Sequence, residues 1–173
     1  MDAITLRRLD DTPANRVAVN AVFVACADYS QLVEGRAPHD GDAVEFFTAV
    51  PPSFLIDDLL LFGIERDAQM IGIAGLLRGW NAPHKTHIGL LLITPEERGQ
   101  HAGAAAVVQL EDVVRALPNM TTLRLAVVAS NVNAFPFWRK MGFVETGEVK
   151  PKSAPYVADI VVMEKLLVSR NVN

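Results

Sequence analysis

The sequence has one cysteine, no excess of positive charge and no long uninterrupted hydrophobic run. Cys26 is alone among 173 residues, so neither an intrachain disulfide nor a cysteine-based zinc site is expected, and a small buried hydrophobe is the commoner use of such a residue. Lys and Arg number 16 against 20 Asp and Glu, which argues against nucleic acid as the partner. The apolar stretch 54–63 contains Asp57 and Asp58 and is too short to cross a membrane.

Further absences narrow the class of protein. Residues 1–5 lack a basic segment followed by an apolar run, so no signal peptide is expected and a cytoplasmic location is the default. His39, His84 and His101 show no metal-ligand spacing, and no metal is expected. Half of the residues are hydrophobic and 21% are charged, which suits a packed globular core. The length predicts a single domain over residues 1–173.

Hydrophobic periodicity and turn residues predict the order of elements. Helices are expected from Thr12 to about Tyr29, then over 42–48, 102–117 and 133–141. Strands are expected over 4–9, 59–65, 70–77, 86–93, 123–128, 143–149 and 156–167. Strands interleaved with helices in this order predict a mixed α/β domain.

The segment 90–104 carries the most chemical information. A buried strand stops at Pro95, and a short loop with Arg98 and Gly99 leads into an amphipathic helix. Free N–H groups and the helix dipole at such a start hold phosphate oxygens, and small residues let the oxygens approach the backbone. An ordinary strand–helix connection has the same outline. The spacing fits neither the P-loop nor the dinucleotide fingerprint.

Two motifs resemble those of the GCN5-related N-acetyltransferases. Ile93-Thr94-Pro95 followed by Arg98-Gly99-Gln100-His101-Ala102-Gly103 is similar to the family's strand end and Q/R-x-x-G-x-G/A helix start, with His101 in place of the first motif glycine. We expect His101 to be already helical, because a left-handed conformation would strain it. Residues 131–143, with Asn131, Ala134, Trp138 and Gly142-Phe143, look like the family's N-x-x-A-x-x-[FL]-[YW]-x-x-x-G-F segment.

The resemblance implies a fold and a co-substrate. It implies a mixed, mostly antiparallel central sheet of about seven strands flanked by helices, with a splayed strand pair that admits acetyl-CoA or a close acyl-CoA. The acyl-CoA core is then about 59–143 and the acceptor-side helices about 12–50. For Asn131, a turn residue at a strand end is the competing interpretation. The implied acyl-CoA-binding residues are Leu91, Leu92, Ile93, Arg98, Gly99, Gln100, His101, Ala102, Gly103, Ala104 and Asn131.

Catalytic groups follow from the same resemblance. Family members often place a glutamate base in an A-E-I pattern that Thr86-His87-Ile88 resembles, so His87 is the candidate general base, with a merely solvated histidine as the alternative. An alternative glutamate position of the family corresponds to Ala126, which cannot serve. Trp138 stands at the usual tyrosine position and cannot transfer a proton in this range, so it packs on the cofactor or in the core. Tyr29, Tyr156 or water are left as donors to the thiolate.

The acceptor side is acidic. Between residues 28 and 58 there are seven carboxylates and one basic residue, Arg36, which favours a cationic amine; a solvated acidic loop is the alternative. Tyr29 is a weak candidate for the acceptor wall. We therefore expect an acyl-CoA-dependent N-acyltransferase acting directly on a small-molecule or peptide amine, with a homodimer left open. The rival from another class is a non-catalytic acyl-CoA-binding or regulatory module.

Overall fold

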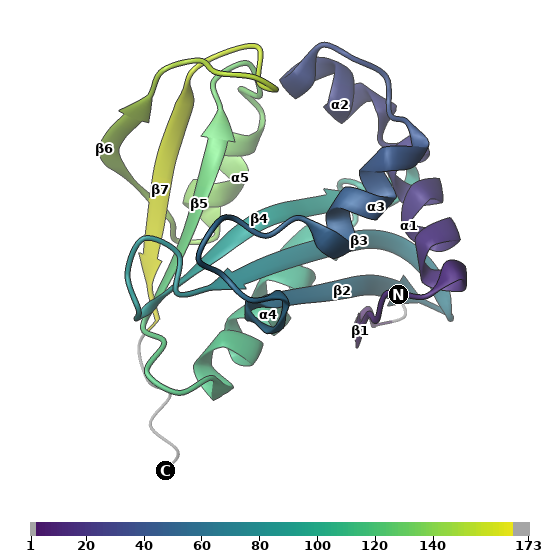
Figure 1. Ribbon diagram of the computed structural model, residues 1–173, viewed down its shortest axis with the longest axis horizontal. Coiled ribbons are helices and arrows are strands. Elements are labelled where there is room, and N and C mark those ends of the chain that lie inside the picture. Colours follow the sequence, from purple (N-terminus) through teal and green to yellow (C-terminus); the bar gives the residue numbers. More distant parts are fainter. Residues whose placement is uncertain (1–2, 168–173) are drawn as a thin grey trace.

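The computed structural model describes residues 3–167. Its centre is a seven-stranded sheet in the order β1-β2-β3-β4-β5-β7-β6, drawn in Figure 1. Every neighbouring pair is antiparallel except β4 and β5, which are parallel. The expected mixed, mostly antiparallel sheet is confirmed. The strands are β1 (Thr5–Arg8), β2 (Leu59–Arg66), β3 (Gln69–Arg78), β4 (Lys85–Ile93), β5 (Thr122–Val128), β6 (Val144–Lys150) and β7 (Ile160–Leu166).

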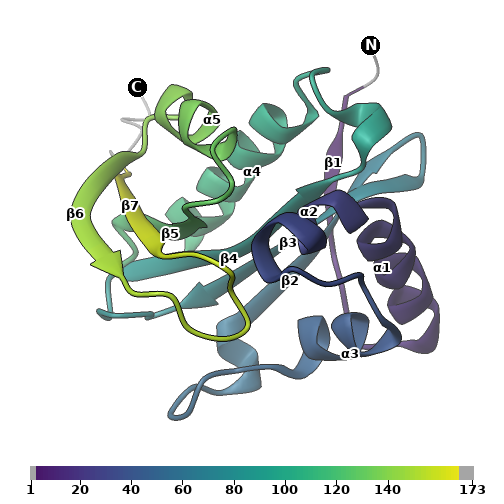
Figure 2. The same cartoon turned by 90° about the horizontal axis from the view of Figure 1, so that it is seen from above.

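Helices cover both faces of the sheet, as Figure 2 shows from above. One face carries α4 (Ala102–Ala116) and α5 (Ala134–Lys140); the other carries α1 (Pro13–Ala25), α2 (Ala27–Glu34) and α3 (Asp40–Thr48). Short 3-10 turns, η1 (Ile56–Asp58) and η2 (Pro95–Glu97), precede β2 and follow β4. Thr12 caps α1 by accepting a hydrogen bond from the Asn15 N–H, and Pro13 occupies the first turn, as the sequence predicts.

Two apolar clusters hold the layers together. On one face, Val107, Leu110 and Val114 of α4 are fully buried against the sheet, which confirms the apolar stripe expected from their spacing. On the other face, Val19 and Val22 of α1 pack with α3 and with β2–β4. Cys26 belongs to this second cluster and has no exposed surface, as expected. The helices of the two faces are thereby fixed against the same strands that form the site.

The parallel pair β4–β5 separates half-way along its length. Pairing runs from Lys85 opposite Thr122 to Ile88 opposite Leu125 and goes no further, although both strands continue. At the same point the β3–β4 register shifts, because Leu76 faces Ile88 while Gly75 faces Leu90, and Gly89 is the extra residue of a β-bulge. A bulge bends its strand and increases the local twist. The bend turns the remainder of β4 away from β5, and the splayed strand pair is present.

Two predicted elements are wrong in their limits. The helix expected from Thr12 to Tyr29 is two helices, broken at Cys26, whose Sγ donates to the Ile93 carbonyl at 3.5 Å. Tyr156, expected in the last strand, lies in the β6–β7 loop. Pro155 has no N–H for the ladder, and the Val157 N–H is spent on the Val33 carbonyl of α2, at 3.0 Å. In both places a tertiary contact overrides the local pattern.

Three contacts fix α2 across the end of the splayed pair. Arg98 pairs with Asp28, the Ser130 hydroxyl after β5 donates to the Leu32 carbonyl at 2.8 Å, and the β6–β7 loop reaches Val33. Figure 1 shows α2 beside this loop, at the open end of β4 and β5. Over residues 3–167, no helix combines the length and the apolar character that a membrane crossing requires.

Candidate active site

A cleft of about 710 Å³ lies between the separated ends of β4 and β5. Most of the residues implied by the resemblance line it together: Leu91, Leu92, Ile93, Arg98, Gly99, His101, Gly103, Ala104 and Asn131. Two do not. The Gln100 side chain turns back to donate to the Glu96 carbonyl at 2.8 Å. Ala102, the first residue of α4, is buried in the core. Beyond Ile88 the edge of β4 that faces β5 has no strand partner, which leaves backbone groups for a ligand.

The turn before α4 uses two left-handed residues. Gly99 has φ 77° and His101, at the N-cap of α4, has φ 63°. The expectation that His101 is already helical is therefore wrong. The chain has to reverse sharply between η2 and α4, and the N-cap position takes the left-handed conformation that the family's glycine adopts without strain. A Cβ placed on Gly99 would meet no atom within 4 Å, so the space beside this turn is open.

Gly103 has a packing role besides its place in the cleft. A Cβ placed there would lie 3.5 Å from Phe137 of α5 and 3.8 Å from Ile93 of β4. The missing side chain therefore lets α4 approach α5 and β4 closely. A bulky substitution at Gly103 would disturb that packing as well as any ligand at the turn, so it is an ambiguous probe of binding.

Arg98 stands in the cleft with its charge already balanced. It forms an ion pair with Asp28 of α2, and its Nε donates to the Ile93 carbonyl at 2.9 Å. The hydrogen bond to Asp28 raises the pKa of Arg98, and the same bond lowers the pKa of the Asp28 carboxyl. Arg98 therefore links the turn before α4 to α2 as well as presenting donors to the cleft.

Trp138 and Asn131 occupy the β5 side of the cleft. Trp138 is 8% exposed and packs edge to face with Phe137 and Phe143, with ring centroids 4.9 and 5.2 Å away. It therefore serves the core and reaches the cleft wall with one edge. Asn131 closes the turn after β5, where its N–H donates to the Val128 carbonyl at 2.8 Å, and its side chain lines the cleft. Both interpretations of Asn131 are compatible with this position.

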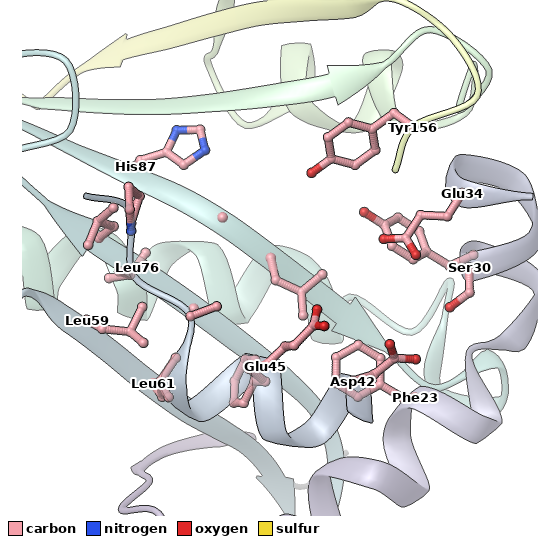
Figure 3. A pocket seen from close by; sticks show the side chains of 18 of the residues that line it. Phe23, Ser30, Glu34, Asp42, Glu45, Leu59, Leu61, Leu76, His87 and Tyr156 are labelled. Carbon is pink, nitrogen blue, oxygen red and sulfur yellow. The ribbon is translucent and has the colours of Figure 1, made fainter. Parts of the chain in front are cut away.

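A second cavity, of about 450 Å³, lies on the α1–α3 side of the sheet (Figure 3). His87 stands on one side of it and Glu34 and Asp42 on the other, with the Tyr156 ring between them. Much of the remaining wall is apolar, from Phe23, Phe46, Pro51, Leu59, Leu61, Leu76, Leu77, Trp80 and Leu90. A concave, largely apolar wall with polar groups at defined places is typical of a small-molecule site.

His87 is a partly buried wall residue, not a solvated one. Its ring lies 6.0 Å from the Trp80 ring, which in turn packs 5.6 Å from Phe54. The Nδ1 atom is closed to solvent without a hydrogen-bond partner among residues 3–167, which leaves Nε2 as the nitrogen open to the cavity. Burial, together with the positive charges of Arg124 and Lys150, lowers the pKa of His87 to about 4. At neutral pH the imidazole is uncharged and has a free lone pair.

The acidic residues of the second cavity outnumber its basic one. Arg36 bonds Asp42 at 2.7 and 3.1 Å and lies 2.6 Å from Glu34, so one cation serves two carboxylates. Glu45 also lines the cavity, and within the described part of the chain its carboxylate makes no hydrogen bond or close ion pair, although its charge acts on Arg36. With neutral His87, the wall carries three carboxylates and one guanidinium. The wall is therefore net negative.

Both tyrosines of the chain line the second cavity, and one of them lines the cleft as well. Tyr29, Gly89 and Leu90 border both spaces, so the two cavities meet there. Burial raises the pKa of Tyr29 far above its usual range and that of Tyr156 to a lesser extent. Both phenols are therefore protonated at neutral pH.

Sequence reasoning missed Gly89 and Trp80. A glycine inside an otherwise apolar strand is a signal for a bulge, and Gly89 fits that signal. Trp80 follows Gly79 in the loop after β3, and nothing in the local sequence marks it as a partner of His87. Among the described residues, no group of three or more His, Cys, Asp or Glu side chains is arranged to hold a metal ion.

Comparison with known families decides the assignment. The model of the acetyltransferase (GNAT) family matches residues 19–143, which is more than half of the chain. The chain belongs to the GNAT family. Among curated proteins no sequence matches. The family match covers the cleft and both motifs on which the resemblance rests.

Solved structures of acetyltransferases share the whole fold. An acetyltransferase from Thermus thermophilus superposes with a TM-score of 0.74 at 20% identity, covering 96% of this chain and 100% of the other. Spermidine N-acetyltransferase from Vibrio cholerae, in complex with CoA and spermine, gives 0.72 at 17% identity and covers 95% of each chain. The ribosomal-protein-S18-alanine N-acetyltransferase from Escherichia coli gives 0.68 at 16% identity, covering 98% and 99%. At these identities the likeness establishes the fold.

Proposed function

We propose that this GNAT protein transfers an acyl group, acetyl in the simplest case, from acyl-CoA directly to the nitrogen of an amine. The observation that carries the proposal is the meeting of two cavities at Gly89 and Leu90, where β4 leaves β5. One cavity holds the residues that resemble the family's acyl-CoA site. The other is net negative and contains a neutral histidine. A thioester that reaches this meeting point through the cleft meets an amine that enters through the second cavity.

The cleft suits acyl-CoA in shape and in chemistry. The pantetheine arm is an extended chain with amides, and the unpaired edge of β4 near Leu91 and Ile93 offers it backbone partners. The pyrophosphate fits the turn from Arg98 to Ala104, where a helix begins beside open space. Asn131 lies on the β5 side, within reach of the arm. The Vibrio cholerae neighbour was solved with CoA, which supports this co-substrate.

His87 is the residue that we assign as the base. An ammonium has no lone pair, so the cationic amine first loses one proton to solvent. The neutral nitrogen then attacks the carbonyl carbon and becomes far more acidic, so that a second proton leaves late. A weak base suffices for that late proton, and a neutral imidazole with Nε2 open to the cavity can take it. The carbon–sulfur bond then breaks and its electron pair leaves with sulfur.

The acceptor is an amine that arrives with a positive charge. Three carboxylates against one guanidinium attract a cation and repel an anionic acceptor. The apolar wall suits a hydrocarbon or aromatic body behind the amine. Neighbours named for acetylating spermidine or an alanine of a ribosomal protein support an amine in general and do not choose between a small molecule and a peptide.

An acceptor screen tests the activity. Acetyl-CoA is incubated with panels of primary amines and terminal-amine peptides, and released thiol is measured; thiol release with a cationic amine is the expected result. Ligand at 100 times its dissociation constant should stabilise the fold by about 2.7 kcal/mol. Binding without thiol release from any amine would favour the non-catalytic module. Absence of binding in both a melting assay and calorimetry would contradict the acyl-CoA assignment itself.

A further inference from the structure

The family's usual position for a tyrosine that assists the thiolate is filled here by Trp138. Trp138 is 8% exposed, is packed between two phenylalanines and carries only an indole N–H. An indole N–H donates a hydrogen bond but does not exchange a proton near neutral pH. If acyl transfer proceeds as proposed, some other group has to face the sulfur as its negative charge develops.

Only one other phenol has access to the cleft. The chain has two tyrosines, and both line the second cavity, which is the proposed acceptor cavity. Tyr29 alone also lines the acyl-CoA cleft. Tyr29 shares that wall with Gly89 and Leu90, where the thioester and the amine have to meet. Its hydroxyl makes no hydrogen bond with any residue of 3–167 and is not among the polar atoms closed to solvent.

The break at Cys26 is what sets Tyr29 at this wall. Helix α2 starts anew at Ala27, and Tyr29 stands in its first turn. The contacts of Asp28, Leu32 and Val33 with three separate segments hold α2 in place on both sides of the cleft. A side chain on a helix tied in this way loses little further freedom when a ligand arrives, which is the condition for a preorganised donor.

We propose that the Tyr29 hydroxyl donates a hydrogen bond to the sulfur of the acyl thioester and stabilises the thiolate as the carbon–sulfur bond breaks. The inference rests on the proposed function, because it assumes acyl-CoA in the cleft. In the balanced step the amine, which has already lost one proton to solvent, bonds through its nitrogen to the carbonyl carbon, its second proton passes to His87, and the sulfur leaves with its electron pair. The proton that finally neutralises the thiolate comes from solvent.

The chemistry of the phenol separates donation from full proton transfer. Burial raises the pKa of Tyr29 far above the value of about 8.5 for a thiol, so transfer of its proton to the thiolate would be unfavourable. The same burial guarantees that the O–H is intact when the thioester binds. Tyr29 therefore acts by electrostatic stabilisation and keeps its proton throughout.

An equilibrium measurement tests this role without an acceptor. CoA with its free thiol is bound to the protein, and the ionisation of the thiol is followed by the ultraviolet absorbance of the thiolate as pH rises. A charge-assisted hydrogen bond contributes about 1.5–3 kcal/mol, so the thiol pKa in the wild-type complex should lie about 1–2 units below that in Tyr29→Phe. The variant should bind CoA at neutral pH with nearly wild-type affinity, because the thiol is then mostly protonated.

Tyr156→Phe is the matched control, because Tyr156 lines only the acceptor cavity. Its complex should show the wild-type thiol pKa, and its turnover should change chiefly in the KM for the amine, whereas Tyr29→Phe should lower kcat by about 10²-fold. An unchanged thiol pKa in Tyr29→Phe, or a shift of equal size in Tyr156→Phe, would overturn the proposal even if turnover is observed. A thiol pKa that is lowered in the wild-type complex and rises again in Tyr29→Phe would support the proposal, even if no amine is found to act as acceptor.

Discussion

His87 and Gly89 lie on the same side of β4, two residues apart, and a Cβ placed on Gly89 would stand 3.9 Å from Cδ2 of the imidazole. The absent side chain leaves open space directly beside the proposed base. Gly89 is also the bulged residue at which β4 departs from β5. One glycine thus bends the strand and leaves space where the two cavities meet.

Filling that space should block acyl transfer while the fold persists. Gly89→Ala adds one methyl group where the two cavities meet, and this Cβ meets nothing closer than 3.9 Å, so the strand accommodates it. One methylene in a specificity pocket corresponds to roughly 10- to 200-fold in kcat/KM, and we expect a loss in that range or larger. CoA, which lacks the acetyl group, should bind to the variant as to the wild type. Wild-type kcat/KM in a folded Gly89→Ala protein would show that the amine approaches elsewhere.

His87→Ala should lower turnover by about 10²- to 10⁴-fold, the usual effect of losing a general base, and leave acetyl-CoA affinity nearly unchanged. Because the pKa of His87 is lowered to about 4, kcat/KM calculated on the concentration of neutral amine should fall on the acidic side only near that pH and not near 6.5. His87→Glu should restore part of the rate. An unperturbed glutamate titrates near ~4.3, so the rescue appears in rate and not in a displaced acidic limb. Full activity and an unchanged profile in His87→Ala would assign the base to water or another residue.

The same histidine should make folding stability depend on pH. Its folded pKa, about 4, lies below the unfolded value of about 6.5, so between these values the unfolded chain binds the extra proton. Stability therefore falls as pH drops from about 6.5 towards 4, with a contribution from His87 of at most about 1.4 kcal/mol per pH unit. His87→Gln removes this contribution. Urea unfolding of both proteins across this range measures it, and parallel curves would contradict the burial of a neutral imidazole.

Arg98 and Asp28 offer a paired test of the phosphate turn. Arg98→Ala removes a donor to phosphate and a tether of α2, and should weaken CoA binding by about 1.5–3 kcal/mol, which is roughly ten- to a hundredfold. Asp28→Ala removes the tether alone and leaves the guanidinium free for phosphate. Calorimetry should find its CoA affinity equal to or better than that of the wild type. Equal losses in the two variants would mean that Arg98 acts through α2 and not on the pyrophosphate.

The parts of the fold that depend on local pattern could be predicted from the sequence. The stripe of Val107, Leu110 and Val114 is spaced for one helix face and is fully buried. Most residues of the two motifs fall together at the cleft, although the turn before α4 and Asn131 belong to different motifs. Periodicity and motif spacing are carried by short segments, which is why they survive without knowledge of the rest of the molecule.

What depends on contacts between distant segments could not be predicted. No residue near Cys26 in the sequence marks a helix break. The break occurs where its thiol donates to the Ile93 carbonyl, on a strand 67 residues away. The sequence around His87 indicates a strand start and leaves its burial open, since the ring that covers it, Trp80, comes from a different loop. Histidine disfavours the left-handed conformation, and at His101 the turn between η2 and α4 imposes it.

Tyr29, Gly89 and Leu90 border both cavities, and this arrangement has a consequence for the order of events in a catalytic cycle. The two cavities reach their meeting point from different sides, so neither substrate has to leave before the other enters, and no side chain has to carry the acyl group between them. A ternary complex is then the natural route. Double-reciprocal rate plots should intersect instead of running parallel, and CoA should compete with acetyl-CoA but not with the amine.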